Sequence, residues 1–158
     1  MKKLKILNLI VFIFSINSLL LYSQNFDKDI ELATNYYQRG VALKNRQASD
    51  SAEFFLSKAA DIFKTYEDWD NYLIINNERG SNFIHSGKID PSINFINEQI
   101  VFCIEKFSDS NEYLANFYNN LGLAYFFKGQ TDNALEMYDK SLGIRIALND
   151  RESLFTSN

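Results

Sequence analysis

Apolar residues recur at helical spacing in the stretch from residue 118 to residue 142. Tyr118, Leu121 and Tyr125 lie three and four residues apart, so they share one face of a helix. Gly129 follows this stripe and is typical of the end of a helix, and a second apolar periodic run begins shortly after it. The pattern therefore predicts two helices joined by a tight turn.

Two small residues indicate how these helices meet. Gly122 has no side chain, so a second helix can approach closely at that point, and Ala134 is the small residue expected to face it. Thr131 can cap the second helix by accepting a free backbone N–H. A single helix pair cannot bury its own apolar face, so further copies of the unit are expected along the chain.

The copies are present at steps of 42 and 40 residues. Going back from Gly122 reaches Gly80 and then Gly40, and Asp90-Pro91 predicts a helix start because proline suits the first helical turn. No segment shows the period-two alternation of a strand. The predicted helices cover residues 26–45, 50–66, 68–86, 91–107, 110–128 and 132–147.

The order Tyr118, Leu121-Gly122, Tyr125, Ala134 and Tyr138 resembles the tetratricopeptide repeat (TPR) pattern W-x2-L-G-x2-Y followed by A-x3-F. The period of 40–42 residues, rather than 34, resembles the extended TPR subclass. The resemblance implies an all-α fold, an α-α superhelix or TPR solenoid of three helix-turn-helix repeats at about 26–67, 68–108 and 109–148. Residues 149–158 are interpreted as the truncated start of a fourth repeat, capped by Asn149-Asp150.

In the TPR family the first helix of each repeat lines a concave groove that binds peptides or partner helices. By position, the resemblance places the following residues in that groove: Thr34, Tyr37, Val41 and Lys44, then Ile74, Asn77, Ser81 and Ile84 with His85 at the rim, then Asn116, Asn119, Leu123, Phe126 and Phe127. Tyr37, Asn77 and Asn119 offer side-chain hydrogen bonds to an extended peptide. An alternative for Phe126 and Phe127 is packing against a neighbouring repeat.

The first residues have the layout of a secretory signal peptide. Three lysines at positions 2, 3 and 5 precede an apolar run over residues 4–21, and Ser23 is a plausible small residue at a cleavage site. We therefore expect residues 1–23 to be removed and the protein to be periplasmic or extracellular. The competing interpretation is an uncleaved N-terminal membrane anchor, since the run is barely long enough to span a bilayer.

Charge and chemistry narrow the function. The whole chain has a formal net charge of −4, and loss of residues 1–23 removes three lysines and no acids, which leaves −7. So acidic a chain repels phosphate backbones, and nucleic acid is not an expected partner. The lone Cys103 cannot form an internal disulfide and is expected to be a buried small apolar residue.

No constellation of catalytic, cofactor-binding or metal-binding residues is found. His85 is the one histidine, and nothing in the sequence orients it as a base, so it is expected to favour the end of a helix. The acidic clusters lack the glycine and closing glutamate of a calcium loop and are expected to cap helices. Glu53, three residues after Asp50, fits a capping box.

Two functions remain open at this stage. The first is an exported, non-enzymatic interaction scaffold that binds a protein or peptide, and the alternative is the extracytoplasmic sensory input segment of a bacterial signalling receptor. The apolar residues Leu142, Ile144, Ile146 and Leu148 also predict an uncovered seam at the end of the third pair. We expect that seam to cause end-to-end self-association or fraying.

Overall fold

Six α-helices account for the fold. The computed structural model describes the backbone of residues 2–107 and 109–156, and the side chains of residues 23, 25–107 and 109–149. The helices are α1 (Lys2–Asn45), α2 (Ser49–Thr65), α3 (Trp69–His85), α4 (Ile89–Lys106), α5 (Glu112–Phe127) and α6 (Thr131–Thr156). The described residues contain no strand, and the predicted all-α class is confirmed.

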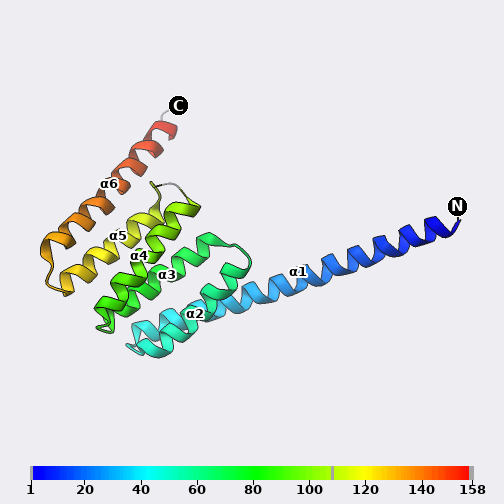
Figure 1. Cartoon of the computed structure of the whole chain (residues 1–158), viewed down its shortest axis with the longest axis horizontal. Helices are drawn as coiled ribbons and strands as arrows, with labels where there is room; N and C mark the ends of the chain where they lie inside the picture. Colours follow the sequence, from blue (N-terminus) through cyan, green and yellow to red (C-terminus); the bar gives the residue numbers. More distant parts are fainter. Residues whose placement is uncertain (1, 108, 157–158) are drawn as a thin grey trace.

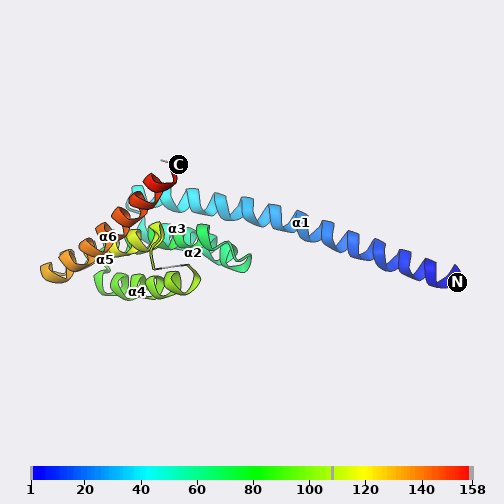
Figure 2. The ribbon, with the colours of Figure 1, turned by 90° about the horizontal axis from the view of Figure 1, so that it is seen from above.

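The helices form three antiparallel pairs arranged side by side (Figures 1 and 2). Each odd-numbered helix packs against the helix that follows it, and α2 and α4 also contact the next odd-numbered helix. Among the described residues, α1 contacts α3 and α3 contacts α5, whereas α2, α4 and α6 do not contact one another. The array therefore curves with α1, α3 and α5 on its inner side, and the predicted superhelix of three repeats is confirmed.

The turn inside each pair has the same backbone geometry. The residue with positive φ is Gln47 at 60°, Gly87 at 75° and Gly129 at 80°. The amide after each of them closes the same turn, with N–O distances of 3.0, 2.9 and 2.9 Å for Ala48 to Leu43, Lys88 to Phe83 and Gln130 to Tyr125. Glycine adopts this left-handed conformation at no steric cost. The recurring turn confirms the period of 40 and 42 residues.

Each pair is closest at the glycine that the sequence singled out. A Cβ at Gly40, Gly80 or Gly122 would lie 2.7 Å from Leu56, 2.9 Å from Ile96 or 2.8 Å from Tyr138, respectively. Ala134 also lies at this contact, but through its backbone oxygen, 3.1 Å from the same hypothetical Cβ of Gly122. The expected approach at Gly122 is therefore present, and Tyr138 is the main neighbour.

We expect Gly122→Ala to destabilise the protein by roughly 1–3 kcal/mol, because the added methyl group must displace a ring and a backbone carbonyl. Gly143→Ala is the matched control. Nothing lies within 4 Å of a Cβ at Gly143, so this helical glycine should gain about 0.5–1 kcal/mol from the higher helix propensity of alanine. Urea unfolding followed by circular dichroism measures both changes, and equal effects of the two substitutions would contradict the close contact.

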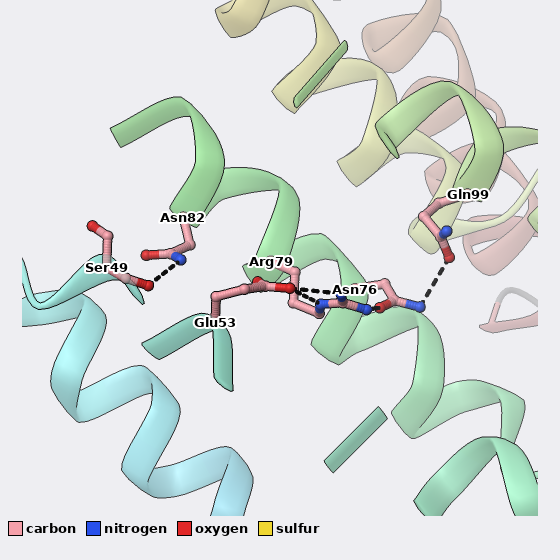
Figure 3. Close-up of polar contacts among 6 residues, drawn as sticks. All are labelled: Ser49, Glu53, Asn76, Arg79, Asn82 and Gln99. Atoms are coloured by element: carbon pink, nitrogen blue, oxygen red, sulfur yellow. Dashed lines mark hydrogen bonds and ion pairs between the residues drawn. The ribbon is translucent and has the colours of Figure 1, made fainter. Parts of the chain in front are cut away.

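A polar network joins the first repeat to the second (Figure 3). Glu53 of α2 accepts hydrogen bonds from Arg79 of α3 at 2.9 Å from Nε and 2.6 Å from Nη2. Arg79 Nη1 donates to Asn76 Oδ1 at 2.9 Å, and Asn76 Nδ2 donates to Gln99 Oε1 of α4 at 2.9 Å. Next to this run of hydrogen bonds, Asn82 Nδ2 donates to the backbone oxygen of Ser49 at 2.9 Å. Three helices are thus linked by one run of hydrogen bonds.

The predicted role of Glu53 is wrong. The residue before α2 is Ala48, which makes no side-chain cap, and Glu53 is partly buried against α3 instead of closing a capping box. Its carboxylate reaches Arg79 because it lies on the face of α2 that meets the next helix. In the following repeat the equivalent positions are Ile93 and Leu121, which lie together in a hydrophobic cluster.

This equivalence predicts the outcome of a double substitution. Arg79→Leu alone leaves the Glu53 carboxylate partly buried without its cation, so we expect a loss of roughly 2–4 kcal/mol, given the residual solvent exposure of both groups. Adding Glu53→Ile reproduces the apolar pair of the next repeat and should restore most of that stability. Asn76 loses the hydrogen bond from Arg79 in both variants. The double variant is therefore compared with Arg79→Leu. A double variant as unstable as Arg79→Leu would show that the pairing is not what links these helices.

Both ends of the array differ from the prediction. α1 begins at Lys2 and has no break near residue 26, and α6 continues through Asn149 and Asp150 to Thr156. The predicted cap at Asn149-Asp150 and the separate helix after it are therefore wrong for residues 149–156. Residues 144–156 include no glycine or proline to reverse the chain, which explains the continuous helix.

The signal-peptide and membrane-anchor predictions concern residues 1–23. Apart from Ser23, their side chains lie outside the described residues. In the part of the chain that the structure does describe, no helix combines the length and apolar character needed to cross a membrane.

Candidate binding groove

The inner face is held together by polar contacts between neighbouring odd-numbered helices. Lys44 Nζ of α1 forms an ion pair with Glu78 Oε2 of α3. Asn120 Nδ2 of α5 donates to Asn77 Oδ1 of α3 at 2.7 Å. At the other end of the same helices, the hydroxyl of Tyr113 donates to Asp70 Oδ1 at 3.0 Å. These contacts fix the spacing of the three inner helices.

A cavity of about 310 Å³ opens between α3 and α5. Its lining residues combine apolar, amide and carboxylate groups: Leu73, Ile74, Asn77, Glu78, Glu112, Tyr113 and Asn116. Asn116 Oδ1 accepts a hydrogen bond of 2.7 Å from Arg145 Nη2 of α6. The cavity can therefore receive an apolar side chain beside groups that hydrogen-bond to a peptide.

A larger hollow of about 670 Å³ lies at the turns of the first two repeats. It is bordered mainly by polar residues, among them Gln47, Ser49 and His85. It lacks apolar side chains among the residues that line it. The smaller cavity is for this reason the better candidate for binding a peptide side chain.

Two phenols of the inner helices have raised pKa values. Burial, followed by the nearby carboxylate of Glu78, raises the pKa of Tyr37. Burial together with Asp70, Glu112 and Asp68 raises the pKa of Tyr113 to about 12. Both phenols therefore remain protonated near neutral pH and act as hydrogen-bond donors.

The predicted groove residues of the first two repeats fall into three environments. Tyr37 and Val41 are half-buried and pack against the hydrophobic cluster of the first repeat, and Lys44 is engaged with Glu78. Ile74 and Asn77 line the cavity between α3 and α5. Three further predicted positions lie outside that cavity: Thr34 and His85 are exposed, and Ser81 is half-buried.

Ile84 was predicted in the groove, and that placement is wrong. Only 3% of its surface is exposed, and it belongs to the hydrophobic cluster that joins the second and third repeats. Lys44 and Phe126, at the equivalent positions of α1 and α5, are more exposed than Ile84. The position is filled by a core residue in the central repeat because helices pack on both of its sides.

In the third repeat the predicted residues separate along α5. Asn116 lines the cavity, whereas Asn119 is exposed and Leu123 packs against the hydrophobic cluster. Phe126 and Phe127 are 58% and 57% exposed and contact each other edge to face at 5.9 Å. Both rings therefore keep more than half of their surface open to solvent, and their role in a groove stays a prediction.

Sequence reasoning missed Glu78, Glu112, Tyr113 and Asn120. Glu78 and Asn120 directly follow the predicted positions Asn77 and Asn119. A helix with 3.6 residues per turn can present two adjacent positions to its neighbours, so these residues could have been included. Within the described residues, no group of three or more His, Cys, Asp or Glu side chains is placed to hold a metal ion.

Cys103 is buried, as the sequence predicted. Its Sγ donates to Asn111 Oδ1 at 3.3 Å, and burial raises the pKa of the thiol. Asn111 Oδ1 also accepts the backbone N–H of Leu114 at 2.9 Å and so caps α5. The thiol therefore supports a helix start.

Comparisons with known proteins agree with the repeat architecture. A sequence model of the tetratricopeptide repeat matches residues 115–145. The TPR domain of Arabidopsis FLU has a TM-score of 0.65 and 15% identity, over 76% of this chain and 98% of that one. BtubC (BKLC) from P. vanneervenii has a TM-score of 0.64 and 18% identity, over 74% of this chain and 48% of that one.

A putative kinesin light chain from Podosopora anserina with nearly identical TPR-like repeats has a TM-score of 0.63 and 13% identity, over 73% of this chain and 56% of that one. The chain thus spans about half the length of the latter two proteins. A search of curated protein sequences found no significant match. The structures share with this chain an α-helical repeat superhelix of the TPR type. The repeat motif matched at residues 115–145 and the likeness of the fold to TPR-domain structures support a tetratricopeptide repeat assignment.

Proposed function

We propose that the chain is a non-enzymatic interaction module that binds an extended peptide or a partner helix across α1, α3 and α5. The cavity between α3 and α5 is the observation that carries the proposal. Apolar clefts with a few convergent polar groups are the usual form of a binding site. Here Ile74 supplies exposed apolar surface, and two asparagines stand beside it.

The asparagines retain unused donors. The Oδ1 atoms of Asn77 and Asn116 accept hydrogen bonds from Asn120 and Arg145, but within the described residues neither Nδ2 group has a partner. Both amides can therefore donate to the carbonyl groups of a peptide without disturbing the contacts between helices. The carboxylates of Glu78 and Glu112 at the cavity disfavour an acidic peptide.

A peptide library displayed on phage provides ligands for testing this proposal, and calorimetry measures their affinities. Ile74→Arg fills the cavity with a long charged side chain, so we expect it to weaken binding by about tenfold or more, roughly 1.4 kcal/mol. Val101→Arg is the matched control, because Val101 is an exposed aliphatic residue of α4, away from the inner face. Equal loss in both variants, or selected peptides insensitive to Ile74→Arg, would contradict binding at the cavity.

Export is the second part of the proposal, and the lysines and apolar run of residues 1–23 support it. We expect the mature protein to begin near Gln24, which mass spectrometry of the protein from the periplasm or culture medium measures. Cytoplasmic protein from the same cells serves as the unprocessed control. Residues 1–23 found intact on membrane-associated protein would instead favour the anchor.

The alternative function is the sensory input segment of a bacterial signalling receptor. An export leader followed by a ligand-binding repeat array favours it over an intracellular role. A membrane-spanning segment and a kinase or DNA-binding region encoded after Asn158 would distinguish this alternative from a free scaffold.

A further inference from the structure

One side of α6 carries an uncovered apolar row. Leu135, Leu142 and Ile146 are spaced by seven and four residues, so they share a helix face. Their exposed fractions are 57%, 56% and 52%. This surface, called the α6 face below, is separate from the inner groove.

Two of the three positions of the α6 face are covered on α4, whereas the third, Ile104 at the position of Ile146, is 42% exposed. The residues 42 positions before Leu135 and Leu142 are Ile93 and Ile100, which are only 8% and 7% exposed. They belong to a hydrophobic cluster with Leu114 and other residues of α5, the helix that packs on them. The α6 face therefore repeats a surface that binds a helix elsewhere in this chain.

A repeated ion pair indicates how such a helix would lie. Lys88, in the turn between α3 and α4, pairs with Asp50 in the first turn of α2 at 2.8 Å, and Lys128, directly after α5, pairs with the equivalent Asp90 of α4 at 2.8 Å. The two lysines differ by two positions in the repeat and reach the same carboxylate position. Asp132 holds the same place on α6, and no cation among the described residues pairs with it. Exposed pairs of this kind contribute little stability, but they can fix register. A helix on the α6 face should run antiparallel to α6 and end in a lysine.

The third indication is the matching of side chains at each joint, the place where the second helix of one repeat packs on the first helix of the next. Glu53 meets Arg79 at the first joint, and Ile93 and Leu121 share one cluster at the second. Leu135 is the equivalent of Glu53 and Ile93, so its partner should be apolar.

α1 of a second copy does not meet these requirements. The segment directly after it has Arg46 at the position of Lys128 and Ala48 at the position of Lys88, so it can supply a cation near Asp132. α1 has Arg39 at the position of Arg79 and Leu121, however, which would place a guanidinium against the apolar Leu135. The chemistry of α1 therefore disfavours the end-to-end self-association that the sequence predicted.

We propose that the α6 face docks one antiparallel amphipathic helix of a partner protein, with an apolar residue against Leu135 and a C-terminal lysine against Asp132. The equivalence of Leu135 and Leu142 to residues of the interface between α4 and α5 supports the proposal, as does the carboxylate of Asp132, which no cation among the described residues pairs with. The interaction is independent of the groove, because its residues lie on α6 rather than on the inner helices.

A peptide of residues 111–128 is the appropriate probe, because it reproduces the α5 sequence that covers the equivalent face of α4. A hydrocarbon link between positions 116 and 120, which face α6 and α3 in the intact protein, holds the peptide helical. Fluorescence anisotropy with the full chain measures its affinity. A control peptide with Leu121→Arg and Lys128→Ala removes both the apolar residue against Leu135 and the cation against Asp132, and we expect it to bind at least about tenfold more weakly.

A charge exchange tests the placement. Leu135→Glu changes an exposed position, so the helicity of the protein should be unchanged. The substitution should weaken binding of the original peptide by about tenfold. Leu135→Glu should also strengthen binding of a peptide that carries Leu121→Arg alone, because the two substitutions together recreate the pair of Glu53 and Arg79. Absence of binding by the linked peptide, or binding indifferent to Leu135→Glu, overturns the proposal. A dimer in sedimentation that Leu135→Glu converts to monomer also overturns it, by identifying a second copy as the occupant.

Discussion

The contact on which the structure depends is the one inside each helix pair, where a glycine of the first helix meets a side chain of the second. At Gly40, Gly80 and Gly122 no room exists for a methyl group, and the facing side chains Leu56, Ile96 and Tyr138 differ in shape. The feature that repeats is therefore the missing Cβ and not the identity of its neighbour. The second helix uses one face for this close contact, and another of its faces packs on the next pair.

The joints between pairs use different chemistry at equivalent positions. The first joint is polar: the Glu53 carboxylate pairs with the Arg79 guanidinium, which lies over the Phe95 ring at 4.8 Å. The second joint is aliphatic. Both joints form within one superhelix, since each side of a joint matches the other. Stability in such arrays is approximately a sum of repeat terms and neighbour terms. A change on one side of a joint is therefore tolerated only with a compensating change on the other.

Helical periodicity predicted the fold because it specifies which residues share a face. Three recurring glycines then located the pairs. Periodicity does not specify which neighbour a face meets, and the errors follow from this limit. Ile84 was placed in the groove by its position, but it is buried because the central repeat has a neighbour on each side. Glu53 was interpreted from its neighbours in sequence, whereas its partner Arg79 is 26 residues away.

The end of α6 shows a related limit. Asn149 and Asp150 suit a helix start, but a side chain can cap a helix only where the backbone has already turned. No residue from 130 to 156 has positive φ or a cis peptide bond, and the chain continues as a helix. Turn-forming residues were thus better indicators of helix ends than cap-forming residues were.

The polar contacts of the inner face determine what kind of recognition it can support. Lys44 is paired with Glu78, so it is not free to hold the carboxylate of a peptide, and Arg145 is similarly engaged with Asn116. The groups that remain are neutral donors: the amides of Asn77 and Asn116 and the phenol of Tyr37, whose pKa is raised. Neutral hydrogen bonds are screened little by salt and do not titrate near pH 7. An acidic surface with such a groove is therefore suited to selecting a peptide by its shape and backbone, with its charge serving mainly to exclude acidic competitors.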